Sequence, residues 1–310
     1  MSAGPTLRIA TRKSQLALWQ AEHVAGRLRA AHPDLAVELV PMSTKGDQIL
    51  DRSLAAIGGK GLFIKELEIA IEQGQADLAV HSMKDVPADL PAGFAIAAVL
   101  DRADPRDALV STQARRIEDL PIGARIGTSS LRRQAQLLAL RPDLRIEPLR
   151  GNLNTRLRRL DEGELDAIVL ASAGLERLGW QSRIAAHLSV EVSLPAVGQG
   201  VIGIECRAGD GRVRGLLAAL EHGATRTAVE AERAFSRRLG GSCQSPVAAY
   251  AELRGDEIAL RGLVAAPDGH RVLSDAARGP AASAAALGAA LAERLLHAGA
   301  EALLRDLRTG

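Results

Sequence analysis

The chain has 310 residues, enough for two or three domains that each bury a core. Its 39 basic and 37 acidic side chains leave a formal net charge of +2, which excludes the strongly basic surface of a non-specific nucleic-acid-binding protein. Only two residues are Cys, which excludes a disulfide-stapled secreted scaffold, and aromatic residues make up 2%, so the core must be aliphatic.

Strand and helix patterns alternate through the first hundred residues, as expected for a parallel sheet covered by helices. Ser14 is a suitable N-cap for a helix that continues to about Ala31. A glycine-rich loop at 58–61 precedes a second helix over 66–72. The predicted strands of this part lie at 6–11, 36–43, 77–81 and 94–100.

A polar segment at 101–107 predicts a connection to a second domain, where the same pattern restarts. The run at 125–128 resembles the run at 8–11, and each precedes a helix with a Ser at its start. A second connection is predicted at 194–200, so two similar α/β domains with a cleft between them are expected. The predicted elements are strands at 125–127, 145–149, 166–171 and 201–206 and helices at 131–140 and 152–160.

The last ninety residues have a different pattern, typical of a small α+β domain. Turn signals separate alternating strands, which favours an antiparallel meander. The elements are a helix at 225–239, strands at 247–253, 257–264 and 271–274, and a helix at 282–297. The fold class is therefore α/β: two similar doubly wound domains, 1–100 plus 200–218 and 105–195, and a third α+β domain over 222–310.

The strongest local motif is His81-Ser82-Met83-Lys84-Asp85-Val86-Pro87. It stands where a buried strand ends, which is where α/β proteins bind ligands. Lys84 and Asp85 place a cation and a carboxylate on one loop. A solvated turn with a surface ion pair is the alternative interpretation.

Arginine accounts for 34 of the 39 basic residues, and five arginines stand at predicted strand-to-helix turns. Helix starts attract anions, and the guanidinium group binds carboxylates bidentately. A polyanionic ligand is the functional interpretation; codon bias and arginine-rich surface helices are the alternatives. The five residues are Arg12, Arg132, Arg133, Arg150 and Arg156.

Cys243 lies in a loop between Gly240-Gly241 and Pro246, which predicts an exposed and specially shaped turn. A cysteine there can be a nucleophile or an attachment point, or a small buried side chain. Cys206 falls within an apolar strand and is expected to be buried. The histidines outside the 81–87 motif show no ligand spacing, so no metal site is predicted.

Together these motifs resemble the porphobilinogen deaminase family, also called hydroxymethylbilane synthases. The resemblance implies two periplasmic-binding-protein-like domains and a third domain whose cysteine, Cys243, holds a dipyrromethane cofactor by a thioether. It implies that four porphobilinogen molecules are joined head to tail with loss of ammonia, and that hydroxymethylbilane is released for haem and related tetrapyrroles. The resembling stretches are 8–18, 58–63, 79–87, 104–107, 127–133, 149–152, 194–200 and 232–246.

The resemblance also implies residue roles, with Asp85 as the catalytic carboxylate. The residues implied to bind the cofactor or the substrate are Arg12, Ser14, Gln20, Lys60, Phe63, Ser82, Lys84, Thr128, Ser129, Ser130, Arg132, Arg133, Arg150, Arg156, Arg177 and Gln199.

A two-lobed periplasmic-binding-type protein that binds or senses small anions is the alternative from another class. Asp85 disfavours it, because a protein that only binds anions has no use for a carboxylate beside its cation. The first twenty residues contain no apolar run of signal-peptide length, so a cytoplasmic protein is expected. A small-molecule substrate, a monomeric state and no nucleic-acid or membrane partner are expected as well.

Overall fold

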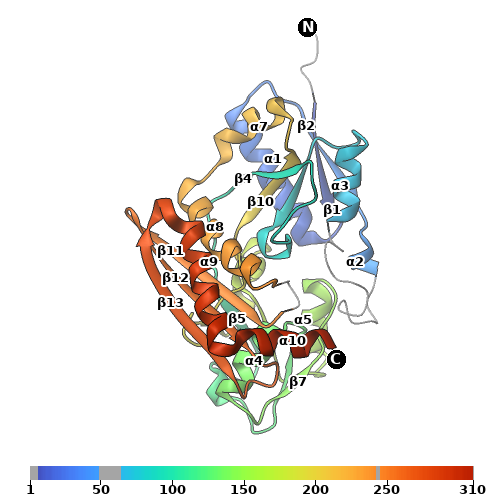
Figure 1. The fold of residues 1–310 in the computed structure, drawn as a ribbon. Helices are drawn as coiled ribbons and strands as arrows, with labels where there is room; N and C mark the ends of the chain where they lie inside the picture. The colour runs from blue at the N-terminus through green and yellow to red at the C-terminus, as the bar shows by residue number, and fades with distance from the viewer. Residues whose placement is uncertain (1–5, 49–63, 242–244, 310) are drawn as a thin grey trace. The chain divides into compact units, whose positions relative to one another are not determined.

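The structure is a computed structural model that describes residues 6–48, 64–241 and 245–309 (Figure 1). The chain divides into two compact units. The first contains the described residues up to Arg102 together with Val201–Arg226, and the second contains Ala103–Gly200 together with the described residues from Thr227 onward.

The first unit is built on a five-stranded sheet of order β2-β1-β3-β10-β4. The first three strands of this order are parallel, and β10 runs antiparallel to both of its neighbours. The strands are β1 (Leu7–Arg12), β2 (Val37–Met42), β3 (Leu78–Ser82), β4 (Phe94–Val99) and β10 (Ile202–Arg207).

Helices cover both faces of this sheet, which makes the unit doubly wound. One face packs Leu7, Ile9 and Val24 into an aliphatic core with α1, and the other packs Ala79 and Leu67 into a core with α3. The helices of this unit are α1 (Gln15–Ala31), α2 (Lys45–Gln48), α3 (Lys65–Glu72) and α7 (Gly211–Leu217).

The second unit repeats this topology in a sheet of order β7-β6-β8-β5-β9. Its first three strands are again parallel, and β5 runs antiparallel beside β8, in the place that β10 takes in the first sheet. The internal repeat is therefore confirmed. The elements are β5 (Asp107–Val110), β6 (Arg125–Gly127), β7 (Arg145–Glu147), β8 (Ala167–Ala171), β9 (Ala186–Leu188), α4 (Leu131–Leu140), α5 (Leu153–Asp161) and α6 (Ser172–Arg177).

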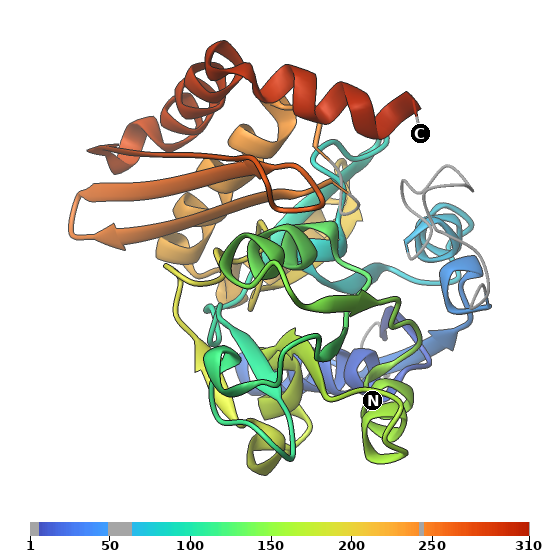
Figure 2. The ribbon, with the colours of Figure 1, turned by 90° about the horizontal axis from the view of Figure 1, so that it is seen from below.

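The second unit also holds a three-stranded antiparallel meander, β11-β12-β13. Its core packs Phe235 of α8 against the sheet and against Leu291 of α9. Helix α9 lies along the sheet, and the chain kinks at Gly299, where φ is 102°, before α10 (Figure 2). The elements are α8 (Gly223–Arg238), β11 (Val247–Arg254), β12 (Glu257–Ala265), β13 (Val272–Pro280), α9 (Ala284–Leu295) and α10 (Glu301–Thr309).

Most predicted elements are confirmed within one or two residues, and the differences concern short or weakly patterned segments. The predicted polar connection at 101–107 ends on a residue that is itself fully buried, Asp107, the first of β5. Strand β13 is twice as long as the predicted 271–274, because its whole length pairs with β12 although its sequence is rich in Ala, Gly and polar residues. Strands β5 and β9 and helices α2, α6, α7 and α10 were not predicted.

Candidate active site

In the first unit, β3 ends in a short 3-10 turn, Met83–Asp85, which carries the two charged residues of the motif. Lys84 and Asp85 are half-buried, and Met83 is buried. The backbone N–H of Met83 donates to the carbonyl oxygen of Val201 at 2.9 Å, which holds the turn against the start of β10. Asp85 therefore lies at the carboxyl end of a parallel strand, as predicted.

Helix α1 brings further predicted residues to the same end of the sheet. Gln20 is buried, and its Nε2 donates to Ser82 Oγ at 2.9 Å. Ser14 Oγ accepts a hydrogen bond from the N–H of Ala17 at 3.4 Å, so Ser14 caps α1 as its sequence position indicates. Arg12 is the half-buried last residue of β1, which neighbours β3. Four of the predicted residues are thus grouped around two adjacent strand ends.

A buried acid–histidine cluster lies under the α3 face of the sheet, just before the Met83–Asp85 turn. His81 Nε2 lies 2.8 Å from Glu205 Oε2 on the neighbouring strand, and both side chains are almost fully buried. Glu68 of α3 faces this pair, and burial together with the negative charge of Glu205 raises the pKa of Glu68 to about 7. The Oε1 atoms of Glu68 and Glu205 accept no hydrogen bond from the described residues, so a proton held on Glu68 can satisfy both carboxyl groups.

Replacing Glu68 by Gln is expected to weaken the pH dependence of stability. The pKa of Glu68 is about 7 in the folded protein against an ordinary 4.5, so the unfolded chain loses this proton first. Stability therefore falls as the pH rises from about 4.5 to about 7, by roughly 3 kcal/mol. Thermal unfolding across this range should show a smaller decrease of Tm for Glu68→Gln than for the parent. Glu22→Gln, at an exposed position on α1, should follow the parent; equal pH slopes for all three proteins would contradict the assignment.

In the second unit, three predicted hydroxyl groups stand between β6 and α4. Thr128 Oγ1 accepts from the N–H of Ser130 at 3.2 Å, and Ser130 Oγ accepts from the N–H of Arg133 at 3.4 Å, which caps α4. Ser129 is exposed, and its Oγ lies 3.1 Å from the carbonyl oxygen and 3.0 Å from the amide nitrogen of Leu149. These bonds shape a helix start that presents backbone N–H groups and favours an anion.

Arg132 and Arg133 are both buried and share one counter-ion, Asp107, which is fully buried. Arg132 Nη1 donates to Asp107 Oδ2 at 2.8 Å, and Arg133 Nη2 donates to Asp107 Oδ1 at 2.7 Å. Burial would raise the pKa of Asp107, but the two guanidinium groups more than offset it and hold the pKa far below its ordinary value. Ser193 Oγ and Gln199 Nε2 also donate to this carboxylate. The sequence predicted both arginines as ligand anchors and missed Asp107, which stands 25 residues away.

The start of α5 offers two more arginines. Asn152 caps this helix by accepting from the N–H of Thr155 at 3.0 Å. Arg156 is half-buried, and its Nε donates to the carbonyl oxygen of Gly151 at 2.8 Å. Arg150 is half-buried and has no hydrogen-bond or ion-pair partner among the described residues. Its guanidinium is therefore available to an anionic ligand.

Two other predicted residues are involved with the connection that ends at Gly200: Arg177 of α6 contacts it, and Gln199 belongs to it. Arg177 Nη2 donates to the carbonyl oxygen of Gly200 at 2.7 Å. Gln199 is buried, and its Nε2 donates to the carbonyl oxygen of Pro105 at 2.7 Å and to Asp107 at 3.0 Å. The amide nitrogen of Gln199 is thus engaged within the second unit.

Three of the predicted residues, Lys60, Phe63 and Cys243, lie outside the described residues. The other cysteine, Cys206, is fully buried in β10, and burial raises the pKa of its thiol to about 11. A neutral, inaccessible thiol is unreactive, which agrees with the expectation for this strand.

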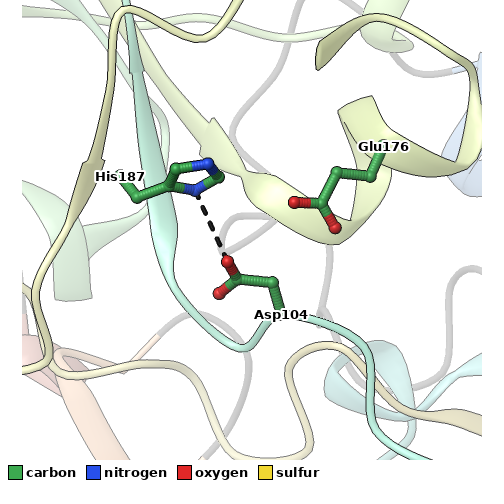
Figure 3. Close-up of side chains that lie close together, drawn as sticks. All are labelled: Asp104, Glu176 and His187. Atoms are coloured by element: carbon green, nitrogen blue, oxygen red, sulfur yellow. Dashed lines mark ion pairs between the residues drawn. The ribbon is translucent and has the colours of Figure 1, made fainter.

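The fold also brings together Asp104, Glu176 and His187, which no sequence spacing connects (Figure 3). Their ligand atoms all lie within 4.8 Å of one another, a geometry that can hold a metal ion. However, the guanidinium of Arg106 already binds both oxygens of Asp104, at 3.0 and 2.6 Å. The charge that a cation would supply is therefore already present, and no metal is assigned here.

Comparison with protein families accounts for these features. Residues 7–215 match the model of the porphobilinogen deaminase dipyrromethane cofactor binding domain, and residues 226–297 match that of the porphobilinogen deaminase C-terminal domain. The chain belongs to the porphobilinogen deaminase family. It is therefore a transferase, a hydroxymethylbilane synthase, which joins four porphobilinogen molecules on a dipyrromethane primer with loss of ammonia. The alternative of a small-anion binding or sensing protein is set aside by these matches.

Solved structures show a more distant likeness. The chain is similar to a nutrient binding protein from Burkholderia cenocepacia bound to methionine, at 13% identity over 68% of this chain and 90% of that one, with a TM-score of 0.45. It is similar to a periplasmic substrate-binding protein of an ABC transporter from Coxiella burnetii, at 16% identity over 71% and 94%, also with a TM-score of 0.45. The BvgS periplasmic VFT2 domain of Bordetella pertussis matches at 17% identity over 70% and 86%, with a TM-score of 0.43.

Proposed function

We propose that Asp85 is the catalytic carboxylate of this transferase and that Cys243 carries the dipyrromethane. The observation that carries the proposal is the position of Asp85, half-buried on the short turn at the carboxyl end of β3, within the part of the chain that matches the cofactor-binding family model. A carboxylate so placed is partly screened from water and held on a rigid strand end.

The chemistry of porphobilinogen needs such a group. Loss of ammonia from the aminomethyl carbon leaves a cationic pyrrole, and positive charge persists while the next carbon–carbon bond forms. Asp85 opposes this charge and accepts hydrogen bonds from pyrrole N–H groups, which lowers the barrier of both steps. Lys84 stands beside Asp85 and suits the carboxylates of the same ligand.

The dipyrromethane and the growing chain carry an acetate and a propionate on every pyrrole, so they need several anchors. The residues present fit such a group: Ser129 is exposed at the start of α4, and Arg150 and Arg156 are half-buried at the start of α5. When bound, the dipyrromethane supplies the nucleophilic pyrrole carbon from which the chain grows. We propose that Arg132 and Arg133 support these anchors by holding the start of α4 through Asp107.

The remaining predicted residues complete this proposal. In the first unit, the proposed substrate-binding residues are Arg12, Ser14, Gln20 and Ser82. In the second unit, Thr128 and Ser130 form the start of α4, where an anion is proposed to bind. Arg177, Gln199, Lys60 and Phe63 are proposed as further binding residues on the family resemblance.

The wider setting of the enzyme is proposed on the same basis. We propose a monomer of three domains that acts on porphobilinogen in the cytoplasm, without a nucleic-acid or membrane partner. Among the described residues, no helix combines the length and the apolar character needed to cross a membrane.

Replacing each cysteine in turn tests whether the dipyrromethane is attached to Cys243. Cys243→Ala is expected to yield a protein whose intact mass equals that of the bare chain, because no thiol is available to form the thioether. Cys206→Ala is the matched control and should retain the mass of a dipyrromethane adduct, since its thiol is buried in β10. Retention of the adduct in Cys243→Ala would exclude Cys243 as the attachment point.

A further inference from the structure

Strand β10 contacts the Asp85 turn through a glycine, Gly203. Gly203 pairs with His81 across the two strands, and a Cβ atom at position 203 would overlap the Sδ atom of Met83. Met83 is 2% exposed, so an added Cβ would force its side chain to shift against buried neighbours. The contact therefore depends on the missing side chain at position 203.

The same face of β10 also holds His81, two residues before Met83, through a hydrogen bond. Glu205 follows Gly203 by two residues and points to the same face, where its Oε2 lies 2.8 Å from Nε2 of His81. A buried ionisable pair contributes little net stability, and its best-attested role is to select one arrangement of the chain. Glu68 of α3 interacts with both Glu205 and His81 and completes this cluster.

These contacts form one column on the sheet face. His81 lies on β3 and Met83 follows it by two residues in the turn, while Glu205 and Gly203 are two residues apart on β10. Each pair is buried, and the column ends at the turn that carries Asp85. A shift of the Met83 backbone would move Lys84 and Asp85, which follow it directly in the turn.

We infer that Gly203 and Glu205 are positioning residues for catalysis, which set the place of the Asp85 carboxylate by way of Met83 and His81. This inference rests on the proposed role of Asp85. It assigns a catalytic contribution to a strand that lies about 120 residues away in the sequence and that touches no reacting atom in the proposal.

The test is steady-state product formation from porphobilinogen by Gly203→Ala and Glu205→Gln. We expect kcat to fall on the order of tenfold to a hundredfold with little change in KM, because positional errors below an ångström or two act on the transition state. Gly215→Ala is the matched control, since a Cβ at that position of α7 meets nothing within 4 Å, and it should keep the parental kcat. Intact mass and Tm are recorded to show that each variant is folded and carries the adduct.

The deciding measurement is kcat of Gly203→Ala and of Glu205→Gln when each is combined with Asp85→Asn. If β10 acts through Asp85, the second change should lower kcat by less than twofold there, since the carboxylate whose place it sets is already absent. An equal reduction of kcat in both backgrounds would overturn the inference and leave the role of Asp85 intact. Parental turnover by Asp85→Asn alone would instead refute the proposed function, so the two failures are distinguishable. If Gly203→Ala does not fold, Glu205→Gln carries the same comparison, because it keeps the shape of the side chain and removes only its charge.

Discussion

Asp85→Asn is expected to lower the rate of hydroxymethylbilane formation by on the order of 10²-fold or more, the effect of removing one preorganised electrostatic group from an active site. Asn preserves the size of the side chain and part of its hydrogen bonding, but it removes the negative charge. The carboxylates of the ligand are anchored by other residues, so binding should suffer less than turnover. The dipyrromethane adduct should accordingly still be detectable by intact mass.

Asp85→Glu separates charge from position. It retains the charge and moves it by about one methylene group, so its rate should lie between those of the parent and the Asn variant. The expected order is Asp above Glu above Asn, measured as product formation with the adduct mass recorded for each protein. Asp34→Asn, at an exposed position between α1 and β2, is the control and should leave the rate unchanged. Near-parental turnover by Asp85→Asn would show that Asp85 is only a charged residue in a turn.

Asp107→Asn should produce the largest loss of stability. The carboxylate is fully buried and neutralises the buried guanidinium groups of Arg132 and Arg133. Removing one partner of a buried ion pair typically costs about 3–5 kcal/mol, because the remaining charge is left without compensation. Denaturant unfolding of the parent and of the variant gives this difference directly, provided that both unfold in one transition.

The pH dependence and a surface control make this prediction specific. The pKa of Asp107 lies far below its ordinary value of 3.8, so its contribution to stability is fully present above about pH 4 and is lost as the pH falls through the lowered pKa. The difference in the free energy of unfolding between the parent and Asp107→Asn should therefore become smaller only at strongly acidic pH. Asp161→Asn breaks an exposed pair with Arg183 and should change stability little. Equal effects of the two substitutions would mean that the buried cluster does not stabilise α4.

The same variant also tests how the arginines contribute to ligand binding. If Arg132 and Arg133 act by holding the start of α4, Asp107→Asn should reduce the amount of dipyrromethane adduct even though Asp107 bears the same charge sign as the ligand. If the arginines bind the ligand carboxylates directly, release from Asp107 should leave adduct formation unchanged or raise it. Intact mass of freshly purified protein distinguishes the two outcomes.

The sequence by itself determined the parts of this protein that depend on neighbours along the chain. Ser14, Ser130 and Asn152 each accept a hydrogen bond from an N–H three residues onward, so the starts of α1, α4 and α5 could be predicted from local chemistry. The position of Asp85 after a buried strand followed from the apolar run at 77–81, which predicted that strand. The repeated strand-to-helix pattern predicted two similar sheets for the same reason, and the motifs spread along the chain indicated its family.

Only the tertiary structure decided which distant groups neutralise one another. Asp107 meets Arg132 and Arg133, and Glu205 meets His81 across 124 residues, because antiparallel strands inserted from remote segments lie beside the parallel ones. Strands β5 and β9 have only four and three residues and, unlike β6 and β7, are not followed by a recognisable helix start, so no local pattern indicated them. The sequence therefore did not show that Asp107 neutralises Arg132 and Arg133, or that β10 contacts the turn that carries Asp85. Burial and counter-charge arise only when segments far apart in the chain are packed together.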